Sequence, residues 1–249
     1  MARDFDGTND ILNINAVAVT GIPFTLAAWF RADVINKTMA ILWIGDKDDT
    51  NEMHYIQAAG LSGGDPVHAN TTAAAGGGTA ATTSGFSANT WHHAAGVWVA
   101  NNNRAAFIDG GSKGTNANNR TPGGFDRIRI GSRGDSTPSN YFNGRIAEAA
   151  IYNVALSDAE VAVLASGVSP LRVRPGNLKG YWPIFGASPE TDFSGQGNPL
   201  TVTQATVADH APVAPSFGFI DMEAGAGEAA VAAFDTPILG ASMVGILGG

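Results

Sequence analysis

The sequence contains no cysteine and little charge, since only 14% of its 249 residues are Asp, Glu, Lys or Arg. Without cysteine, disulfides and thiolate metal sites are excluded. The 22 acidic residues outnumber the 14 Lys and Arg residues, which makes the formal net charge −8. Such a charge disfavours binding to nucleic-acid phosphates and to anionic membranes, so we expect neither as a partner.

Two kinds of apolar segment are also missing. The first residues contain no basic stretch followed by an apolar run, so we expect no cleaved signal peptide and synthesis in a cytosol. The C-terminal apolar stretch is interrupted by Asp235 and Pro237, and what remains is shorter than the roughly 20 residues of a membrane-spanning helix. We therefore predict no membrane insertion.

Glycine is abundant, at 32 residues, in a chain that is 44% hydrophobic. This composition favours short strands joined by tight turns over a helical bundle. All-β domains of this length commonly fold as one unit. The sequence therefore predicts a single all-β domain with one core.

Hydrophobic alternation and turn residues locate the expected strands. Apolar residues alternate over residues 24–31, where Phe24, Leu26, Ala28 and Phe30 share one strand face. Further strands are expected at residues 39–44, 53–58, 67–73, 91–100, 104–108, 125–131 and 141–152. Residues 60–90 are rich in Gly, Ala, Thr and Ser, which predicts weakly specified strands and mobile loops.

One short helix is expected after the last of these strands. Ser157 and Glu160 have the spacing of a capping box, in which each side chain accepts a hydrogen bond from the other residue's backbone. Gly167 is a suitable stop signal. The helix should span about two turns.

Four segments resemble the laminin G-like, concanavalin A-like jelly-roll family. They are residues 4–10, residues 24–31, residues 91–95 with 107–110, and residues 129–160. The resemblance implies an all-β jelly-roll β-sandwich with one short helix.

A further block resembles the segment that usually opens such domains, although here it follows the helix. It contains Gly180-Tyr181-Trp182-Pro183 and residues 192–202. The first and last strands of a sandwich can be neighbours, so a sheet can be completed from either end of the chain. We predict one domain over residues 1–216 in which residues 178–206 lie beside residues 2–14.

The family resemblance implies sugar binding, protein binding or glycoside cleavage. Cleavage requires two carboxylates that flank the scissile bond. The related glucanases carry acidic residues at alternate positions of one strand, and this sequence has no such pattern. Glu52, Glu148 and Glu160 lie far apart in sequence. We predict a non-enzymatic protein, with glycoside hydrolase as the least favoured alternative.

Several short motifs have simpler interpretations. The nucleophile-elbow pattern at residues 60–64 lies in a Gly-rich loop without the required following helix. His92 and His93 should point to opposite faces of a strand and so cannot share one metal. Chance is the better explanation of the adhesion-like tripeptide Arg133-Gly134-Asp135, and core packing is the more common role of the five tryptophans.

Calcium is the one cofactor that the resemblance suggests, because many relatives bind an ion through loop oxygens. The candidate ligands are Asp6, Asn9 and Asp10, followed by the acidic turn at residues 46–51. Pairs such as Asn-Asp and Asp-Gly are also ordinary turn chemistry.

Residues 217–249 form an apolar tail beyond the expected domain. An apolar strip usually marks an interface, so we predict contact with another subunit or with a particle. The predicted contact residues are Phe217, Phe219, Ile220, Ile238, Leu239, Met243, Val244, Ile246 and Leu247.

Permuted sandwiches of this kind are similar to structural proteins of tailed bacteriophages. The resemblance implies a virion component, a capsid decoration or tail-associated protein, that is made in the host cytoplasm and forms homo-oligomers or binds other virion proteins. The alternative is a calcium-dependent carbohydrate-binding module with a cell-surface glycan as partner.

Overall fold

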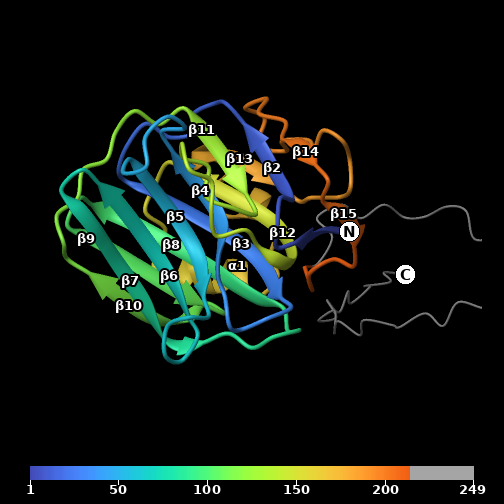
Figure 1. The fold of residues 1–249 in the computed structure, drawn as a ribbon, viewed down its shortest axis with the longest axis horizontal. Coiled ribbons are helices and arrows are strands. Elements are labelled where there is room, and N and C mark those ends of the chain that lie inside the picture. Colours follow the sequence, from blue (N-terminus) through green and yellow to red (C-terminus); the bar gives the residue numbers. More distant parts are fainter. Residues whose placement is uncertain (214–249) are drawn as a thin grey trace, which may run out of the picture. The chain divides into compact units, whose positions relative to one another are not determined.

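The computed structural model describes residues 1–213 and consists of two antiparallel β-sheets packed face to face (Figure 1). The chain divides into two units, Met1–Ser216 and Phe217–Gly249. The tail residues predicted to contact a partner lie outside the described residues. The described part confirms the predicted jelly-roll β-sandwich with one short α-helix. No helix within residues 1–213 has the length and apolarity required to cross a membrane.

The first sheet, sheet A, contains eight strands. Its order is β10 (Gly111–Asn116), β9 (Asn103–Ile108), β8 (His92–Ala100), β3 (Phe24–Ala32), β12 (Asn143–Tyr152), β1 (Ala2–Asp6) and β15 (Thr206–Ala208). The eighth strand, β13 (Leu178–Trp182), pairs with the second half of β12, while β1 pairs with its first half.

The second sheet, sheet B, contains seven strands. Its order is β14 (Thr201–Thr203), β2 (Ile11–Ile14), β11 (Arg127–Ile130), β4 (Thr38–Gly45), β5 (Met53–Ala59), β6 (Pro66–Ala73) and β7 (Gly76–Gly85). The 39–44/53–58 hairpin expected from the sequence corresponds to β4 and β5, and the 91–100/104–108 hairpin to β8 and β9.

The main core lies between the two sheets. Phe24, Leu26, Ala28 and Phe30 of β3 are fully buried in it, as their alternation predicts. The intervening residues of β3 are buried as well, because the outer face of sheet A is also covered. The strand therefore reads as apolar on both faces, which is typical of a central strand with two packed sides.

The helix α1 (Asp158–Ala165) covers part of that outer face, where Val161 and Leu164 are buried against sheet A. Ser157 caps it, and the predicted capping box with Glu160 is present. Two short 3-10 turns, Pro170–Arg172 and Pro175–Asn177, lead from the helix to β13.

The Gly- and Thr-rich segment differs from its expected weak structure, because β6 and β7 are full strands of eight and ten residues. Small residues are required there by close approaches. A Cβ atom on Gly78 would lie 2.0 Å from the Nη1 atom of the buried Arg104 side chain. The glycine content of β7 makes the strand hard to predict from sequence, but at Gly78 it provides the space that the Arg104 guanidinium occupies.

Residues from the end of the described chain complete both sheets. β14 pairs with β2 in sheet B, and β15 pairs with β1 in sheet A. The N-terminus consequently lies next to β15 (Figure 1). β14 and Thr206 of β15 fall within residues 178–206 and lie beside β2 and β1, whereas β13 of the same segment pairs with β12.

Arg3 fastens this late segment to β1. Its guanidinium donates hydrogen bonds to the carboxylate of the buried Glu190 at 2.8 Å and to the carbonyls of Ala187 at 2.6 Å and Ala205 at 2.8 Å. Gly186 N also donates to Glu190, at 3.0 Å. This buried network fixes the backbone that leads into β15, and with it one wall of the cavity described next.

Candidate functional site: an acidic pocket at the edge of sheet A

A cavity of about 490 Å³ lies where β1, the turn after it and β15 meet. Its volume falls within the range of small-molecule sites in proteins. Eight residues line it: Asp4, Phe5, Asp6, Asp10, Asp33, Asn143, Gln204 and Thr206. We call this cavity the acidic pocket.

Strand alternation on β1 places the two first carboxylates. Phe5 points into the main core, so Asp4 and Asp6 point to the opposite, outer face of sheet A. The register sets their neighbours, because Asp6 lies opposite Asn143 of β12 and Asp4 lies opposite Thr206 of β15. The polar side chains of β1, β12 and β15 thus form one wall of the acidic pocket.

The turn after β1 adds Asp10. Asp6 Oδ1 accepts hydrogen bonds from the backbone of Thr8 at 2.8 Å and Asn9 at 3.3 Å, an arrangement that stabilises the turn. Gly7 provides the required positive φ of 80°. Asp10 Oδ2 then accepts a hydrogen bond from Asp6 N at 2.9 Å. The turn therefore places the Asp10 carboxylate against the backbone of Asp6, where the charge of Asp6 acts on it.

The pocket has more negative than positive charge. Arg31 pairs with Asp33 at 2.7 Å. Arg145 lies 4.0 Å from Asp4 and 3.5 Å from Asp209. Within residues 1–213, Asp6 and Asp10 have no cationic partner at ion-pair distance.

Burial and like charge raise the pKa of two of these carboxyl groups. For Asp4 the causes are burial and the neighbouring charge of Asp33, which outweigh the opposing effect of Arg145 and Arg31. For Asp10 burial is again the largest cause, and the charges of Asp6 and Asp4 add to it. Both shifts indicate that the ionised pocket would be stabilised by a bound cation or hydrogen-bond donor.

The predicted calcium ligands are only partly assembled. Asp6 and Asp10 both line the acidic pocket, whereas Asn9 does not. Their carboxylate oxygens are the ligand type that calcium prefers, so the donor chemistry fits. Calcium binding by Asp6, Asn9 and Asp10 stays a prediction.

The second calcium candidate, the turn at residues 46–51, contributes Asp46 and Asp48 to a tighter cluster. With Asp126 they form the one group within residues 1–213 in which three carboxylates lie within 4.8 Å of one another. Lys47 Nζ lies 2.6 Å from Asp48 Oδ2 and 2.8 Å from Asp126 Oδ2. These hydrogen bonds raise the pKa of Lys47. The Lys47 ammonium group thus already pairs with two of the three carboxylates.

Sequence reasoning missed Asp4, Asp33, Asn143, Gln204 and Thr206 as pocket residues. Asp4 could have been found, because it alternates with Phe5 and shares a strand face with Asp6. The other four are brought to the pocket by pairing between distant strands and loops. Nothing in their local sequence signals that neighbourhood.

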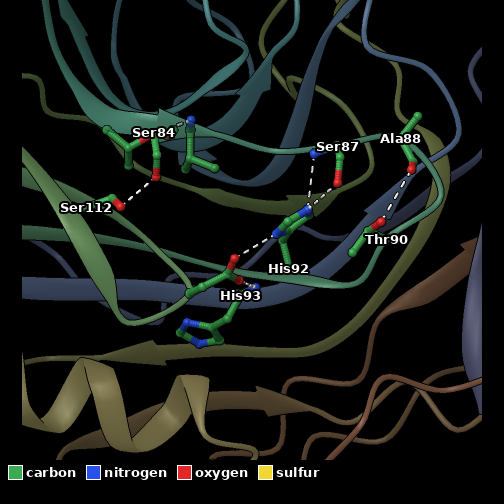
Figure 2. Close-up of polar contacts among 10 residues, drawn as sticks. Ser84, Ser87, Ala88, Thr90, His92, His93 and Ser112 are labelled. Atoms are coloured by element: carbon green, nitrogen blue, oxygen red, sulfur yellow. Dashed lines mark hydrogen bonds and ion pairs between the residues drawn. The ribbon is translucent and has the colours of Figure 1, made fainter.

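Ser87, His92 and Asp109 form a second polar arrangement. His92 Nδ1 lies 2.7 Å from Asp109 Oδ2, and His92 Nε2 lies 3.3 Å from Ser87 Oγ (Figure 2). This order is that of a serine-hydrolase triad. However, the backbone N–H of Ser87 donates to the same Nε2 atom at 3.1 Å, so the lone pair that a general base needs is already engaged. The arrangement ties the loop before β8 to the β9–β10 turn.

His93 points away from His92, as alternation predicts (Figure 2). Its ring packs against Trp29 with centroids 5.6 Å apart. Burial lowers the pKa of His93 to about 4, although the nearby Asp109 partly opposes this shift. His93 therefore serves as a neutral core residue.

Each of the three glutamates considered for catalysis has a structural partner. Glu52 accepts hydrogen bonds from Gly123 N at 2.8 Å and Ala74 N at 3.2 Å. The buried Glu148 accepts one from the Tyr181 hydroxyl at 2.6 Å. Glu160 caps the helix. Each of these three carboxylates thus has a role in holding local structure.

The adhesion-like tripeptide is closed on itself. Asp135 is 1% exposed, and its carboxylate pairs with Arg133. Such a carboxylate is unavailable to an outside receptor unless the loop opens. Three of the five tryptophans, Trp43, Trp98 and Trp182, are fully buried.

Comparisons with known proteins agree with this fold. A provisionally named carbohydrate-binding protein from Bacteroides ovatus is similar, with a TM-score of 0.59 and 18% identity. The matched region covers 86% of this chain but only 61% of that protein. The CBM40 module of the Ruminococcus gnavus IT-sialidase, bound to α2,3-sialyllactose, has a TM-score of 0.53 and 14% identity over 66% of this chain and 98% of its own.

Domain 4 of an extracellular arabinanase from Geobacillus stearothermophilus, in complex with arabinotriose, has a TM-score of 0.51. It is 22% identical over 66% of this chain and 76% of its own. No curated protein sequence matches the chain. The family model of the concanavalin A-like lectin/glucanases superfamily matches residues 6–162, which is more than half of the sequence. The chain therefore belongs to the concanavalin A-like lectin/glucanases superfamily.

Proposed function

We propose that this chain is a non-enzymatic carbohydrate-binding module whose glycan occupies the acidic pocket. The observation that carries the proposal is the pocket itself, a cavity of about 490 Å³ whose polar side chains come from three strands and three loops. Similar structures that are themselves sugar-binding domains support it.

The chemistry of the lining suits sugar hydroxyl groups. Carboxylates accept hydrogen bonds strongly, and every sugar hydroxyl can donate one. The amides of Asn143 and Gln204 can both donate and accept, and the Thr206 hydroxyl can do the same. The Arg3 network holds the wall that carries Gln204 and Thr206, so little order need be gained on binding.

To test the proposal, the full chain is screened on a glycan array, and its affinity for each glycan that binds is then measured by calorimetry. Asp4→Asn keeps the shape of the pocket side chain and removes its charge, and we expect it to weaken binding by about tenfold. Asp158→Asn makes the same change at an exposed position on α1 and should leave affinity unchanged. If the Asp4→Asn variant and the wild type have equal affinities for every glycan that binds, the binding site lies elsewhere.

Calcium is tested in the same titrations. A bound calcium ion would supply positive charge and coordination sites for sugar hydroxyls, and Asp6 and Asp10 would hold it. The calcium-dependent form of the proposal expects affinity to fall in excess chelator and to return when calcium is added. Binding that is insensitive to chelator would leave a calcium-independent module.

The virion role of the tail is a second proposal, favoured by the apolar sequence at residues 217–249. The comparisons provide no resemblance to phage proteins that would support it. Light scattering of the full chain and of a chain ending at Ser216 tests it. Self-association, or addition to a particle, should require the tail, and identical monomers would remove the basis of the proposal.

A further inference from the structure

The acidic pocket contains a charge that its own cations do not neutralise. The Arg31 guanidinium is shared between Asp33 at 2.7 Å and the Asn89 side chain at 2.8 Å. Arg145 is divided between Asp4 and Asp209. Lys37 donates to the carbonyl oxygen of Gly7 at 2.6 Å rather than to a carboxylate. The charges of Asp6 and Asp10 therefore remain for a ligand to meet.

Asp10 is more buried than Asp4 or Asp6. The residue is only 7% exposed, yet it lines the cavity. Its Oδ2 atom accepts the hydrogen bond from Asp6 N, and Oδ1 has no hydrogen-bond donor within residues 1–213. This oxygen is not enclosed by the protein, so it is open to the cavity and to water. The free oxygen beside the cavity thus marks where a ligand donor would gain most.

We propose that the acidic pocket selects glycans that carry a primary ammonium group, such as glucosamine oligomers, over their N-acetylated and carboxylate-bearing counterparts. This inference rests on the proposed function and names its ligand class. An ammonium group has three N–H donors and a full charge, which match the carboxylates of Asp6 and Asp10 that line the pocket.

The same geometry rejects the two competitors for different reasons. An acetamido group offers one N–H donor without charge, so it leaves the carboxylates uncompensated. A carboxylate on the sugar would lie among four aspartates while both nearby arginines are engaged, and like charges at this range repel. Selection therefore comes from repulsion as well as attraction.

Calorimetry with three tetrasaccharides tests the inference: a glucosamine tetramer, its fully N-acetylated form, and a uronic acid tetramer. At about pH 6 the amine is protonated and an ordinary carboxyl group is ionised. With chelator and physiological salt, we expect the glucosamine tetramer to bind about tenfold more tightly than the acetylated one. The uronic acid tetramer should not bind.

Two variants separate specific recognition from general attraction to an acidic protein. Asp10→Asn should reduce the preference for the amine to about equal affinities. Asp158→Asn removes one exposed charge without touching the pocket, so the preference should persist. A preference that survives in Asp10→Asn would overturn the assignment to this carboxylate.

The outcomes also distinguish the inference from the function on which it rests. Equal or tighter binding of the acetylated tetramer overturns the charge selection and leaves carbohydrate binding intact. Failure of every glycan, on the array and in solution, overturns the proposed function itself. Weaker glucosamine binding in excess calcium is expected, because both cations would require Asp6 and Asp10, so this inference belongs to the calcium-independent form of the proposed function.

Discussion

At the scale of single residues, the carboxylates of the acidic pocket carry a cost in stability. Asp10 is buried close to Asp6 and Asp4, and it lacks a cationic partner among the described residues. Sites that wait for a ligand commonly contain such unfavourable arrangements in the free protein. The ligand, when bound, would relieve the repulsion.

This cost predicts that Asp10→Asn stabilises the free protein at pH 7. Asn keeps an oxygen that can accept the hydrogen bond from Asp6 N and removes the charge, so the free energy of unfolding should rise by about 0.5–1 kcal/mol. Burial holds the folded pKa of Asp10 above the ordinary value of 3.8, so the native state binds more protons. The free energy of unfolding of the wild type therefore falls as pH rises from about 3.8 through the folded pKa of Asp10. The Asp10→Asn variant should lack this pH dependence.

Urea denaturation from pH 4 to pH 7 measures both effects. A variant that is less stable than the wild type at pH 7 would show that the carboxylate is well satisfied in the free protein. The Asp158→Asn variant again serves as the matched control, because its carboxylate is exposed and paired with Lys113.

His54 produces the opposite pH dependence. The Thr71 hydroxyl accepts the indole N–H of Trp98 at 2.8 Å, so its own hydrogen is free to be donated to His54 Nδ1 at 2.9 Å. Nδ1 must then be unprotonated. Burial, aided by the charge of Arg104, lowers the pKa of His54 to about 3.

Stability should therefore decline as pH falls below about 6.5, because the unfolded chain gains a proton that the folded state refuses. The slope contributed by one such histidine is about 1.4 kcal/mol per pH unit. In His54→Asn this contribution should disappear, although the variant will be less stable at pH 7. An unchanged slope between pH 6 and pH 4 would refute the neutral assignment.

At the scale of elements, local sequence predicted those features that local interactions determine. The helix and its capping box follow from Ser157 and Glu160, and the β4–β5 and β8–β9 hairpins follow from alternation and turn residues. β7 could not be predicted as clearly, because its small residues are required by side chains that pack against them from distant parts of the chain. Gly78 makes room for Arg104, which is 26 positions later.

Gly78 and Gly77 provide a direct test of that explanation. A Cβ on Gly78 would lie 2.0 Å from Arg104 Nη1, whereas a Cβ on Gly77 would meet only Thr71 O at 3.8 Å. Gly78→Ala should destabilise the protein by about 2 kcal/mol or more, and Gly77→Ala should have little effect. Thermal unfolding of both variants checks this, and equal stabilities would mean that the Arg104 side chain moves aside readily.

The helix α1 offers a second test at this scale. Eight residues are too few for a stable isolated helix, so α1 depends on its packing and its cap. Ser157 Oγ accepts the hydrogen bond from Glu160 N, and Glu160 Oε2 accepts one from Ser157 N at 2.9 Å. Ser157→Ala should cost about 1 kcal/mol in urea denaturation. A loss below about 0.3 kcal/mol would mean that packing alone holds the helix.

At the scale of the whole molecule, the last described segments are part of the fold. Trp182, Ile184 and Leu200 are fully buried in the main core, and β14 and β15 pair with β2 and β1. A chain that ends at Asn177 should therefore remain unfolded, whereas one that ends at Val213 should fold cooperatively. Circular dichroism and thermal unfolding of the two chains measure this, and a folded shorter chain would contradict it.

Long-range strand pairing also explains why only two of the eight pocket residues, Asp6 and Asp10, were site candidates in the sequence. Asp6 and Asp10 belong to one turn and could be read from neighbouring residues. Gln204 and Thr206 reach them only because β15 forms the edge of sheet A beside β1. Long-range strand pairing decides that neighbourhood, and a local pattern contains no information about it.

The pairing of β1 with β15 also sets a waiting time during synthesis. Ala2 leaves the ribosome roughly 200 residues before its partner Ala208 does. At typical elongation rates this delay is on the order of 10 to 40 seconds. Throughout that interval the outer edge of β1 has no strand to pair with, so the nascent chain depends on chaperones, or on the slowness of wrong pairing, to keep this edge free.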